Sequence, residues 1–252
     1  MVNILLNGCN GKMGQVISRF AKEYDDIEII AGVDINNDKD NSYPVVNDIS
    51  NMTSDVDVVI DFSHPSAFDK VLDYCLNKKT AVVMATTGLS ETQKQQLKKA
   101  SNEIPVFFSA NMSLGVNLMI ALCNNAAKFL EGKFDIEIIE KHHNQKVDAP
   151  SGTALAIADS INTTLDDKMN YVYNREPERK KRETNEIGIH SVRGGSIVGE
   201  HSVIFAGQDE IIEIKHEALS KDIFARGALK AALYMKDKPK GFYNMDSMIK
   251  AQ

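Results

Sequence analysis

The 252-residue sequence contains no tryptophan and only three cysteines. Cys9, Cys75 and Cys123 are odd in number and widely spaced, which indicates neither a disulfide framework nor a zinc knuckle. No apolar run approaches the roughly 18 residues of a membrane-spanning helix. The first six residues run straight into a strand pattern and lack the basic segment of a signal peptide. We therefore expect a soluble cytoplasmic protein that does not interact with membranes.

Positive charge is also scarce, because 29 lysines and arginines are outnumbered by 35 aspartates and glutamates. The net charge of −6 argues against binding of nucleic acid by bulk electrostatic attraction. Hydrophobic residues make up 43% of the chain and charged residues 25%, which is ordinary for a globular protein. The length is enough for one large domain or two modest domains with proper cores.

The N-terminal sequence has the pattern of a dinucleotide-binding loop. An apolar run at 2–7 predicts a buried strand, and apolar residues then recur at helical spacing. Gly8, Gly11 and Gly14 lie between the two, where glycines let the backbone turn tightly and approach a pyrophosphate at a helix N-terminus. Asn10 stands where the commonest fingerprint has glycine, and asparagine tolerates left-handed dihedrals better than most residues.

A second strand is predicted at 27–33, and Asp34 ends it about 20 residues after Gly14, where the fingerprint places an acid. An acid at this position binds the adenosine ribose hydroxyls and repels a 2′-phosphate. We therefore expect a preference for NADH over NADPH. Lys12 and Lys39 keep NADPH open as an alternative, because either side chain is long enough to reach a phosphate.

Three further apolar runs continue the strand pattern after Asp34, at 56–62, 81–85 and 106–109. Each is followed by a polar turn and a helix pattern. Strands that alternate with helices predict an α/β fold with a Rossmann-like, doubly wound parallel sheet. In such a sheet the ligand binds at the carboxyl ends of the strands, where these turns lie.

After a long helix predicted at 114–130, the pattern changes. Strand patterns cover 134–140, 187–193, 197–206 and 210–217, and the last three are joined by Gly194-Gly195 and by residues 207–209. Short glycine turns imply antiparallel neighbours, so we expect a second, α+β domain with a mostly antiparallel sheet. The dinucleotide-binding domain is predicted to contain residues 1–112 and 221–252, and the second domain residues 113–220.

Two histidines and a lysine lie between the strand predicted at 134–140 and the helix pattern that begins near Leu155. A strand-to-helix connection presents its side chains instead of burying them, and this one contains His142, His143 and Lys146. An imidazole can donate a proton near neutral pH, and the lysine adds a full positive charge. The adjacent histidines do not have the spacing of a metal site, and no metal is predicted.

The same connection ends in a sequence typical of an anion site. Ser151 is a good helix N-cap, and Gly152 and Thr153 follow as the first helical residues. Their backbone N–H groups have no partner within the helix and point outward at the positive end of its dipole, so a carboxylate or phosphate is favoured there. The loop therefore predicts a site for an acidic small molecule that must gain a proton.

The run from Glu140 to Ala154 resembles the signature of the 4-hydroxy-tetrahydrodipicolinate reductase (dihydrodipicolinate reductase) family. Both histidines, Lys146, Asp148 and the sequence Ala-Pro-Ser-Gly-Thr-Ala are present without a gap, and the resemblance covers essentially the whole chain. It implies NAD(P)H-dependent reduction of 4-hydroxy-tetrahydrodipicolinate to tetrahydrodipicolinate in the diaminopimelate route to lysine. It also implies that residues 113–220 bind the dicarboxylate substrate and build a homotetramer through their sheet.

By position, the resemblance implies roles for individual residues. His142 matches the proton donor and Lys146 the second donor. His143, Gly152 and Thr153 match contacts of the substrate carboxylates. The residues expected to bind the cofactor, including the glycine loop, are Gly8, Cys9, Asn10, Gly11, Lys12, Met13, Asp34, Ala85, Thr86, Thr87, Ser109, Ala110, Asn111 and Met112. The sequence departs from the family pattern at Ala85, in place of a glycine, and at Lys221, in place of an arginine, and Met112 stands where the family often has phenylalanine.

Two other functions stay open beside this one. Another two-domain NAD(P) dehydrogenase of an acidic, amino-acid-like substrate is disfavoured by the paired histidines and the Pro-Ser-Gly-Thr sequence. A dinucleotide sensor without turnover is disfavoured because a sensor needs no proton donors beside an anion site. The basic run from Arg175 to Arg182 is interpreted either as a solvated mobile loop or as a lid that contacts anionic ligands. His64 is expected to cap or pack locally.

Overall fold

The computed structural model describes residues 1–177 and 179–251. The chain forms two compact units. The first contains Met1–Leu114 and Asp222–Gln252, and the second contains Gly115–Lys221. Within the described residues, no helix is both long and apolar enough to cross a membrane.

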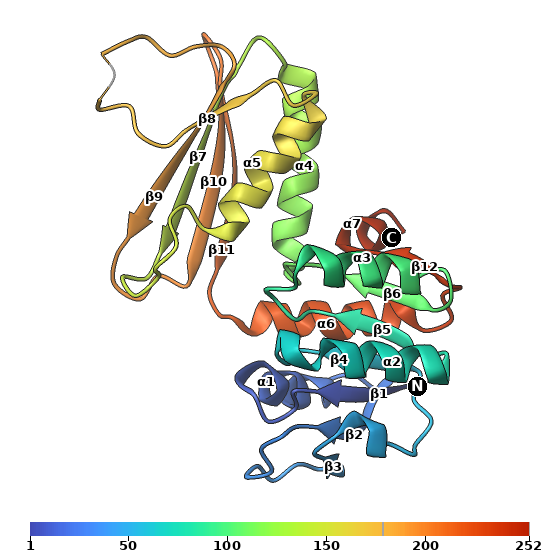
Figure 1. Ribbon diagram of the computed structural model, residues 1–252. Coiled ribbons are helices and arrows are strands. Elements are labelled where there is room, and N and C mark those ends of the chain that lie inside the picture. Colours follow the sequence, from blue (N-terminus) through green and yellow to red (C-terminus); the bar gives the residue numbers. More distant parts are fainter. Residues whose placement is uncertain (178, 252) are drawn as a thin grey trace. The chain divides into compact units, whose positions relative to one another are not determined.

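Seven parallel strands form the sheet of the first unit, in the order β12-β6-β5-β4-β1-β2-β3 (Figure 1). They are β1 (Val2–Asn7), β2 (Ile27–Val33), β3 (Val45–Val46), β4 (Val58–Asp61), β5 (Ala81–Met84), β6 (Pro105–Phe108) and β12 (Gly241–Tyr243). Apolar runs predict the five inner strands. The sequence pattern does not predict β3 and β12, which are only two and three residues long and lie at the two edges.

Helices cover both faces of this sheet. One face carries α1 (Lys12–Ala21), α6 (Asp222–Met235) and α7 (Met245–Lys250), and the other carries α2 (Phe68–Lys78) and α3 (Glu91–Ala100), with short 3-10 helices η1 (Ile49–Asn51) and η2 (Pro65–Ala67). Neighbouring strand residues point to opposite faces. Leu6 and Ile60 are buried in the cluster with α1 and α6. Leu5 and Val59, one position earlier, are buried in the cluster with α2 and α3. This arrangement confirms the predicted doubly wound fold.

The carboxyl ends of the central strands are tied together by the buried carboxylate of Asp61, which is 0% exposed. Its Oδ1 accepts hydrogen bonds from Asn7 Nδ2 at 2.7 Å and from Ser63 Oγ at 2.6 Å. Its Oδ2 accepts one from Thr86 Oγ1 at 2.7 Å. A buried carboxylate with this many donors is well satisfied. It fixes the loops after β1, β4 and β5 relative to one another.

The second unit is a five-stranded sheet with two helices on one face (Figure 1). Its elements are α4 (Leu114–Leu130, which begins in the first unit), β7 (Asp135–His142), α5 (Gly152–Thr164), β8 (Asn170–Val172), β9 (Glu186–Arg193), β10 (Gly199–Ala206) and β11 (Ile211–Ala218). Alternate residues of β7 face the helices, so Ile136 and Ile138 pack with Ile157 and Ile161 of α5. The predicted helix at 114–130 is confirmed.

The strand order β11-β10-β7-β9-β8 makes this a mixed sheet. β10 is antiparallel to β7 and β11, whereas β9 is parallel to β7 and β8. The α+β class is confirmed, but the expectation that the Gly194-Gly195 turn joins neighbouring strands is wrong. β7 lies between β9 and β10, and the turn pairs with the end of β7 instead. Gly194 N–H donates to His142 O at 2.9 Å, and Asn144 N–H donates to Gly195 O at 3.2 Å.

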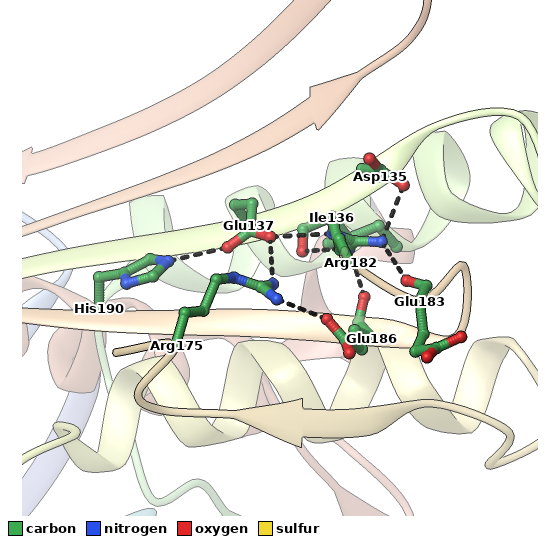
Figure 2. Close-up of polar contacts among 8 residues, drawn as sticks. All are labelled: Asp135, Ile136, Glu137, Arg175, Arg182, Glu183, Glu186 and His190. Atoms are coloured by element: carbon green, nitrogen blue, oxygen red, sulfur yellow. Dashed lines mark hydrogen bonds and ion pairs between the residues drawn. The ribbon is translucent and has the colours of Figure 1, made fainter. Parts of the chain in front are cut away.

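The other face of β7 carries a charged network in place of an apolar layer (Figure 2). Glu137 Oε1 accepts from Arg175 Nη2 at 2.8 Å and from Arg182 Nε at 3.0 Å. Its Oε2 lies 2.8 Å from His190 Nε2. Arg175 Nη1 also donates to Glu186 Oε2 at 2.6 Å. These contacts attach the segment before β9 to the middle of the sheet.

Arg182 donates more of the hydrogen bonds in this network than any other residue shown in Figure 2. Beyond Glu137, it donates to Asp135 Oδ1 at 2.8 Å and to the backbone carbonyl oxygens of Ile136, Glu183 and Glu186. Neither interpretation of the basic run therefore fits Arg175 and Arg182, which bind acids of their own sheet. Glu178, within that run, lies outside the described residues.

Arg182→Ala is expected to destabilise the second unit by about 1–3 kcal/mol, because partly buried carbonyl and carboxylate groups lose their donors. Urea unfolding, followed by circular dichroism, measures this change. Lys181→Ala is the matched control, since this neighbouring side chain is exposed, and its expected effect is within about 0.5 kcal/mol. Equal stability of the two variants would contradict the structural role of Arg182.

Candidate active site

The loop between β1 and α1 has the close backbone approach that a pyrophosphate site requires. Gly8 has a φ of 81°, and a Cβ there would lie 2.8 Å from Phe62 O. A Cβ at Gly14, in the first turn of α1, would lie 2.2 Å from Gly8 O and 2.5 Å from Cys9 O. Both positions therefore exclude side chains. Gly11 is the N-cap of α1, so the loop leads directly to the positive end of this helix.

Asn10 holds this loop by hydrogen bonds and not by a left-handed backbone, which corrects the reason given for it from sequence. Its backbone N–H donates to Asp34 Oδ2 at 2.9 Å, and its side-chain amide donates to Asn36 O. Asn41 Nδ2 donates to Asn10 Oδ1 at 2.8 Å. Asp34 Oδ1 also accepts from Asn36 N–H at 3.0 Å. The acid at the end of β2 is therefore fixed against the glycine loop.

A pocket of about 440 Å³ opens at this edge of the sheet, within the first unit. Its walls include Gly8, Gly11, Asp34, Ser63 and His64, which lie just beyond the carboxyl ends of β1, β2 and β4. A glycine loop, an acid at the end of β2 and a pocket at these strand ends fit a dinucleotide. The side chain of His64 accepts a hydrogen bond from the second residue of η2, so its predicted capping role is confirmed.

Three residues predicted to bind the cofactor have side chains that turn into the protein. Cys9 is fully buried, and burial raises the pKa of its thiol to about 11, with a smaller contribution from Asp34, so it stays protonated. Thr86 donates its hydroxyl to the buried carboxylate of β4. Met112 is 3% exposed and belongs to the core. Such residues can meet a ligand only through their backbone.

The other residues predicted to bind the cofactor lie in the same unit. They are in α1 or directly after β5 and β6: Lys12, Met13, Ala85, Thr87, Ser109, Ala110 and Asn111. Ser109 Oγ donates to Asn111 O at 2.7 Å and closes the turn after β6. The predicted set is therefore gathered at one edge of one sheet.

The second unit presents a buried carboxylate–imidazole pair. Strand alternation puts Glu140 and His142 on the same face of β7, where they are 0% and 9% exposed. His142 Nδ1 lies 2.6 Å from Glu140 Oε2. Arg193 binds the same carboxylate with both terminal nitrogens, Nη1 to Oε2 and Nη2 to Oε1, each at 2.7 Å. Ser151 N–H donates to Oε1 at 3.0 Å.

The donors around Glu140 decide its charge. Burial alone would raise its pKa, but hydrogen bonds from Arg193, His142, Ser191 and Ser151 lower it to about 2. The carboxylate is therefore ionised at every working pH and acts only as an acceptor. Because it can only accept, the proton between Glu140 and His142 belongs to Nδ1 of the imidazole.

His142 itself has a pKa below its ordinary value. Burial is the largest cause, and it outweighs the opposite effect of Glu140, while the charges of Lys146 and Arg193 lower the pKa further. His201 packs edge-on against the ring, with a centroid distance of 5.2 Å. Burial, followed by the neighbouring His142, lowers the pKa of His201 to about 4. Two neutral imidazoles therefore lie side by side in the free protein at neutral pH.

Lys146 already binds a carboxylate, that of Asp148. Lys146 Nζ lies 2.8 Å from Asp148 Oδ1, and hydrogen bonding to Lys146 lowers the pKa of this carboxyl. A Cβ on Gly152 would meet nothing within 4 Å, so the helix end is open. Thr153 follows in the helix, and His143 is half-buried nearby in the sequence. All the residues predicted to act on the substrate lie in this unit, around the start of α5.

Two family models match the chain. "Dihydrodipicolinate reductase, N-terminus" matches residues 2–112, and "Dihydrodipicolinate reductase, C-terminus" matches residues 115–249. The chain belongs to the dihydrodipicolinate reductase family. It is similar to two proteins named 4-hydroxy-tetrahydrodipicolinate reductase. That of Clostridium tetani is 52% identical over 249 residues, 99% of this chain and 97% of the relative. That of Caldanaerobacter subterraneus subsp. tengcongensis is 52% identical over 250 residues, 99% of each chain.

A solved structure of the family agrees with this assignment. The dipicolinate-bound dihydrodipicolinate reductase of Paenisporosarcina sp. TG-14 has a TM-score of 0.82 and 26% identity, and the match covers 97% of both chains. The aspartate dehydrogenase of Thermotoga maritima has a TM-score of 0.55 and 14% identity, over 95% of this chain and 98% of that chain. The second likeness shows a shared fold alone.

Sequence reasoning missed part of the site. It assigned no role to Glu140, Arg193 or His201, although all three contact the predicted acid or its neighbours. Strand period is the signal that finds Glu140, because a residue two before His142 on a strand must share its face. Arg193 and His201 gave no such signal, since they come from strands more than 50 residues further along the chain.

Proposed function

We propose that this protein catalyses the NAD(P)H-dependent reduction of 4-hydroxy-tetrahydrodipicolinate to tetrahydrodipicolinate, a step of diaminopimelate and lysine biosynthesis. One observation carries the proposal: a chain that the dihydrodipicolinate reductase family models match over residues 2–112 and 115–249 has a buried, carboxylate-bound imidazole, a nearby lysine and an open helix N-terminus. A cytoplasmic location is part of the same proposal.

The two units divide the work. The first binds the dinucleotide with the glycine loop and Asp34, and the bound nicotinamide supplies the hydride. In the second unit, the N–H groups of Gly152 and Thr153, together with His143, bind the substrate carboxylates. The positive end of α5 offsets their charge. Dipicolinate, which is bound in the related Paenisporosarcina structure, is a cyclic dicarboxylate like the proposed substrate. It therefore supports the assignment.

His142 and Lys146 are the two groups placed to donate the one proton that the ring takes up after hydride addition. In the free protein the ammonium of Lys146 forms an ion pair with Asp148 at 2.8 Å. A substrate carboxylate that binds Lys146 therefore displaces the carboxylate of Asp148. Two substrate charges beside His142 favour its protonated form, because an opposite charge within about 4–6 Å stabilises a cation. Substrate binding thus counteracts the burial that keeps the ring neutral in the free protein.

The assay for this function follows the absorbance of NADH or NADPH with substrate made in situ by a coupled synthase, because the substrate is unstable. Consumption of cofactor that depends on the substrate is the expected result. With an active synthase verified, binding of the cofactor without consumption would instead favour a dinucleotide sensor.

NADH is the proposed preferred cofactor, because the carboxylate of Asp34 lies in the pocket wall and repels a 2′-phosphate. We expect kcat/KM to be higher for NADH than for NADPH. Asp34→Ala is expected to reduce the ratio of kcat/KM for NADH to kcat/KM for NADPH by about tenfold. This corresponds to one lost charged hydrogen bond of about 1.5 kcal/mol. Lys39→Ala is the control, because it shows whether the lysine attracts the 2′-phosphate of NADPH. A wild-type preference for NADPH would contradict the proposal.

A homotetramer built through the sheet of the second unit is also proposed, by likeness to the family. The face of this sheet opposite α4 and α5 carries the network around Glu137 and is the face available for it. Size-exclusion chromatography with light scattering tests this directly. A monomer at assay concentration would refute it.

A further inference from the structure

Glu140 is placed to act on a single histidine. It is fully buried on β7, and it shares the same strand face as His142 two residues later. Both of its oxygens are held by Arg193 in a bidentate pair at 2.7 Å. A planar guanidinium that grips both oxygens prevents the carboxylate from rotating. The lone pair that faces His142 Nδ1 at 2.6 Å is therefore fixed in direction.

We propose that Glu140, clamped by Arg193, is the positioning residue that holds His142 with its resting proton on Nδ1, so that Nε2 alone exchanges the catalytic proton. The kinetic part of this inference rests on the proposed reductase function. The position of the proton is a property of the protein itself and can be measured without a substrate.

The different roles of Nδ1 and Nε2 follow from the chemistry of the two groups. An ionised carboxylate has no proton to give, so the imidazole must donate through Nδ1. When Nε2 carries a second proton the ring becomes a cation in a buried place, which is unfavourable without a partner charge. Glu140 supplies that charge directly at the other nitrogen. A carboxylate plays the same orienting and stabilising part behind the histidine of serine protease triads.

The other ring nitrogen of His142, Nε2, lies beside Gly199, which has no side chain. A Cβ built on Gly199, the first residue of β10, would lie 3.1 Å from His142 Nε2 and 3.4 Å from Cδ2. Any larger residue would press on the reacting nitrogen. Gly199 therefore keeps the space beside Nε2 clear, whereas Glu140 fixes the opposite side of the ring.

The other groups near the ring do not compete for its proton. They are Glu140 on β7, Arg193 on β9, His201 on β10 and Lys146 in the connecting loop, with His216 of β11 as the register partner of His201. Burial lowers the pKa of both His201 and His216 below the ordinary value, so both are neutral near pH 7. His201 Nε2 is taken by Ser151 Oγ at 3.1 Å. Among residues 1–177 and 179–251, Glu140 is thus the only carboxylate that forms a hydrogen bond with His142.

The first test compares Glu140→Gln with Glu137→Gln. Glu137 is a matched control, because it also binds a histidine and two arginines but on the opposite face of β7. Glu140→Gln is expected to lower kcat about 10–100-fold, less than removal of the acid itself. It is also expected to move the alkaline loss of kcat to lower pH, since the imidazolium loses its anion. An unchanged pH profile would overturn the proposal.

The second test is a double-variant comparison with His142→Asn. If Glu140 acts through His142, the variant with both changes is no slower than His142→Asn alone. Multiplicative losses in the double variant would instead show that Glu140 supports the site by another route, for example through the start of α5.

The third test reads the proton directly by ¹⁵N NMR of histidine-labelled protein without substrate, with His142→Asn to assign the signals. The expected result is the Nδ1–H tautomer for His142 in the wild type and loss of that preference in Glu140→Gln. An Nε2–H tautomer in the wild type would overturn the proposal even if the reductase assay succeeds. If the assay fails, this measurement still decides the inference.

Gly199→Ala keeps the proposal testable if Glu140→Gln does not fold. Its methyl group would lie 3.1 Å from Nε2 and push the ring from its position, so kcat is expected to fall with the affinity for NADH unchanged. Full activity of Gly199→Ala would contradict the assignment of Nε2 as the reacting nitrogen.

Discussion

His142→Asn is expected to lower kcat by about 10²–10⁴-fold, the usual contribution of a positioned acid, with the Kd for NADH unchanged. The imidazole is 9% exposed and held by Glu140, and asparagine cannot donate a proton in its place. Stopped-flow or steady-state oxidation of NADH measures kcat, and fluorescence titration measures the Kd. His190→Asn is the matched control, since this histidine also binds a glutamate but on the other sheet face.

The pH dependence of the wild type follows from the same residue. Only the protonated ring can donate, so kcat is high below the pKa of His142 and falls as the pH rises through it. Burial lowers this pKa below its ordinary value, and the substrate charges raise it again in the complex. His142→Asn is expected to abolish this fall. Near-normal turnover in both His142→Asn and Lys146→Met would reject the chemical role of the loop.

Gly14→Ala is expected to weaken the binding of NADH by about 10–100-fold. Its methyl carbon would lie 2.2 Å from Gly8 O and 2.5 Å from Cys9 O, so the loop over α1 must move. Backbone strain of about 1–3 kcal/mol corresponds to that loss of affinity. Isothermal titration calorimetry with NADH measures it.

Gly11→Ala provides a graded control for the same loop. A Cβ there would lie 3.3 Å from Gly8 O, which is tight but not impossible. The expected loss of affinity is therefore smaller than for Gly14→Ala. Equal affinity of Gly14→Ala and the wild type would show that the cofactor does not use this loop.

The five inner strands of the first unit and the helices α1, α2, α3 and α6 could be predicted from the sequence. Buried parallel strands are short apolar runs, and the glycine loop and Asp34 follow them at fixed spacing. The edge strands β3 and β12 could not be predicted, because two or three residues are too few for a hydrophobic period. Asn10 was placed correctly in the loop, but its function there depends on Asn36 and Asn41, contacts that no local pattern contains.

The second unit shows where sequence reasoning ends. The sequence patterns of β9 and β10 predict that these segments are strands, but they do not predict which strands lie beside them. The position of β7 between β9 and β10 depends on tertiary pairing. The same pairing brings Arg193 to Glu140 from 53 residues away. Local motifs located the acid, the lysine and the helix end, whereas the groups that orient the acid come from distant strands.

The most direct test of the reductase account is the transfer of deuterium from NADH deuterated at C4 to the product. The reaction is run with substrate formed in situ, and tetrahydrodipicolinate is analysed by mass spectrometry. The account predicts a product heavier by one deuterium with the wild type, and the same labelled product with His142→Asn but formed more slowly, in proportion to the lower kcat. Oxidation of the cofactor without deuterium in tetrahydrodipicolinate would contradict it.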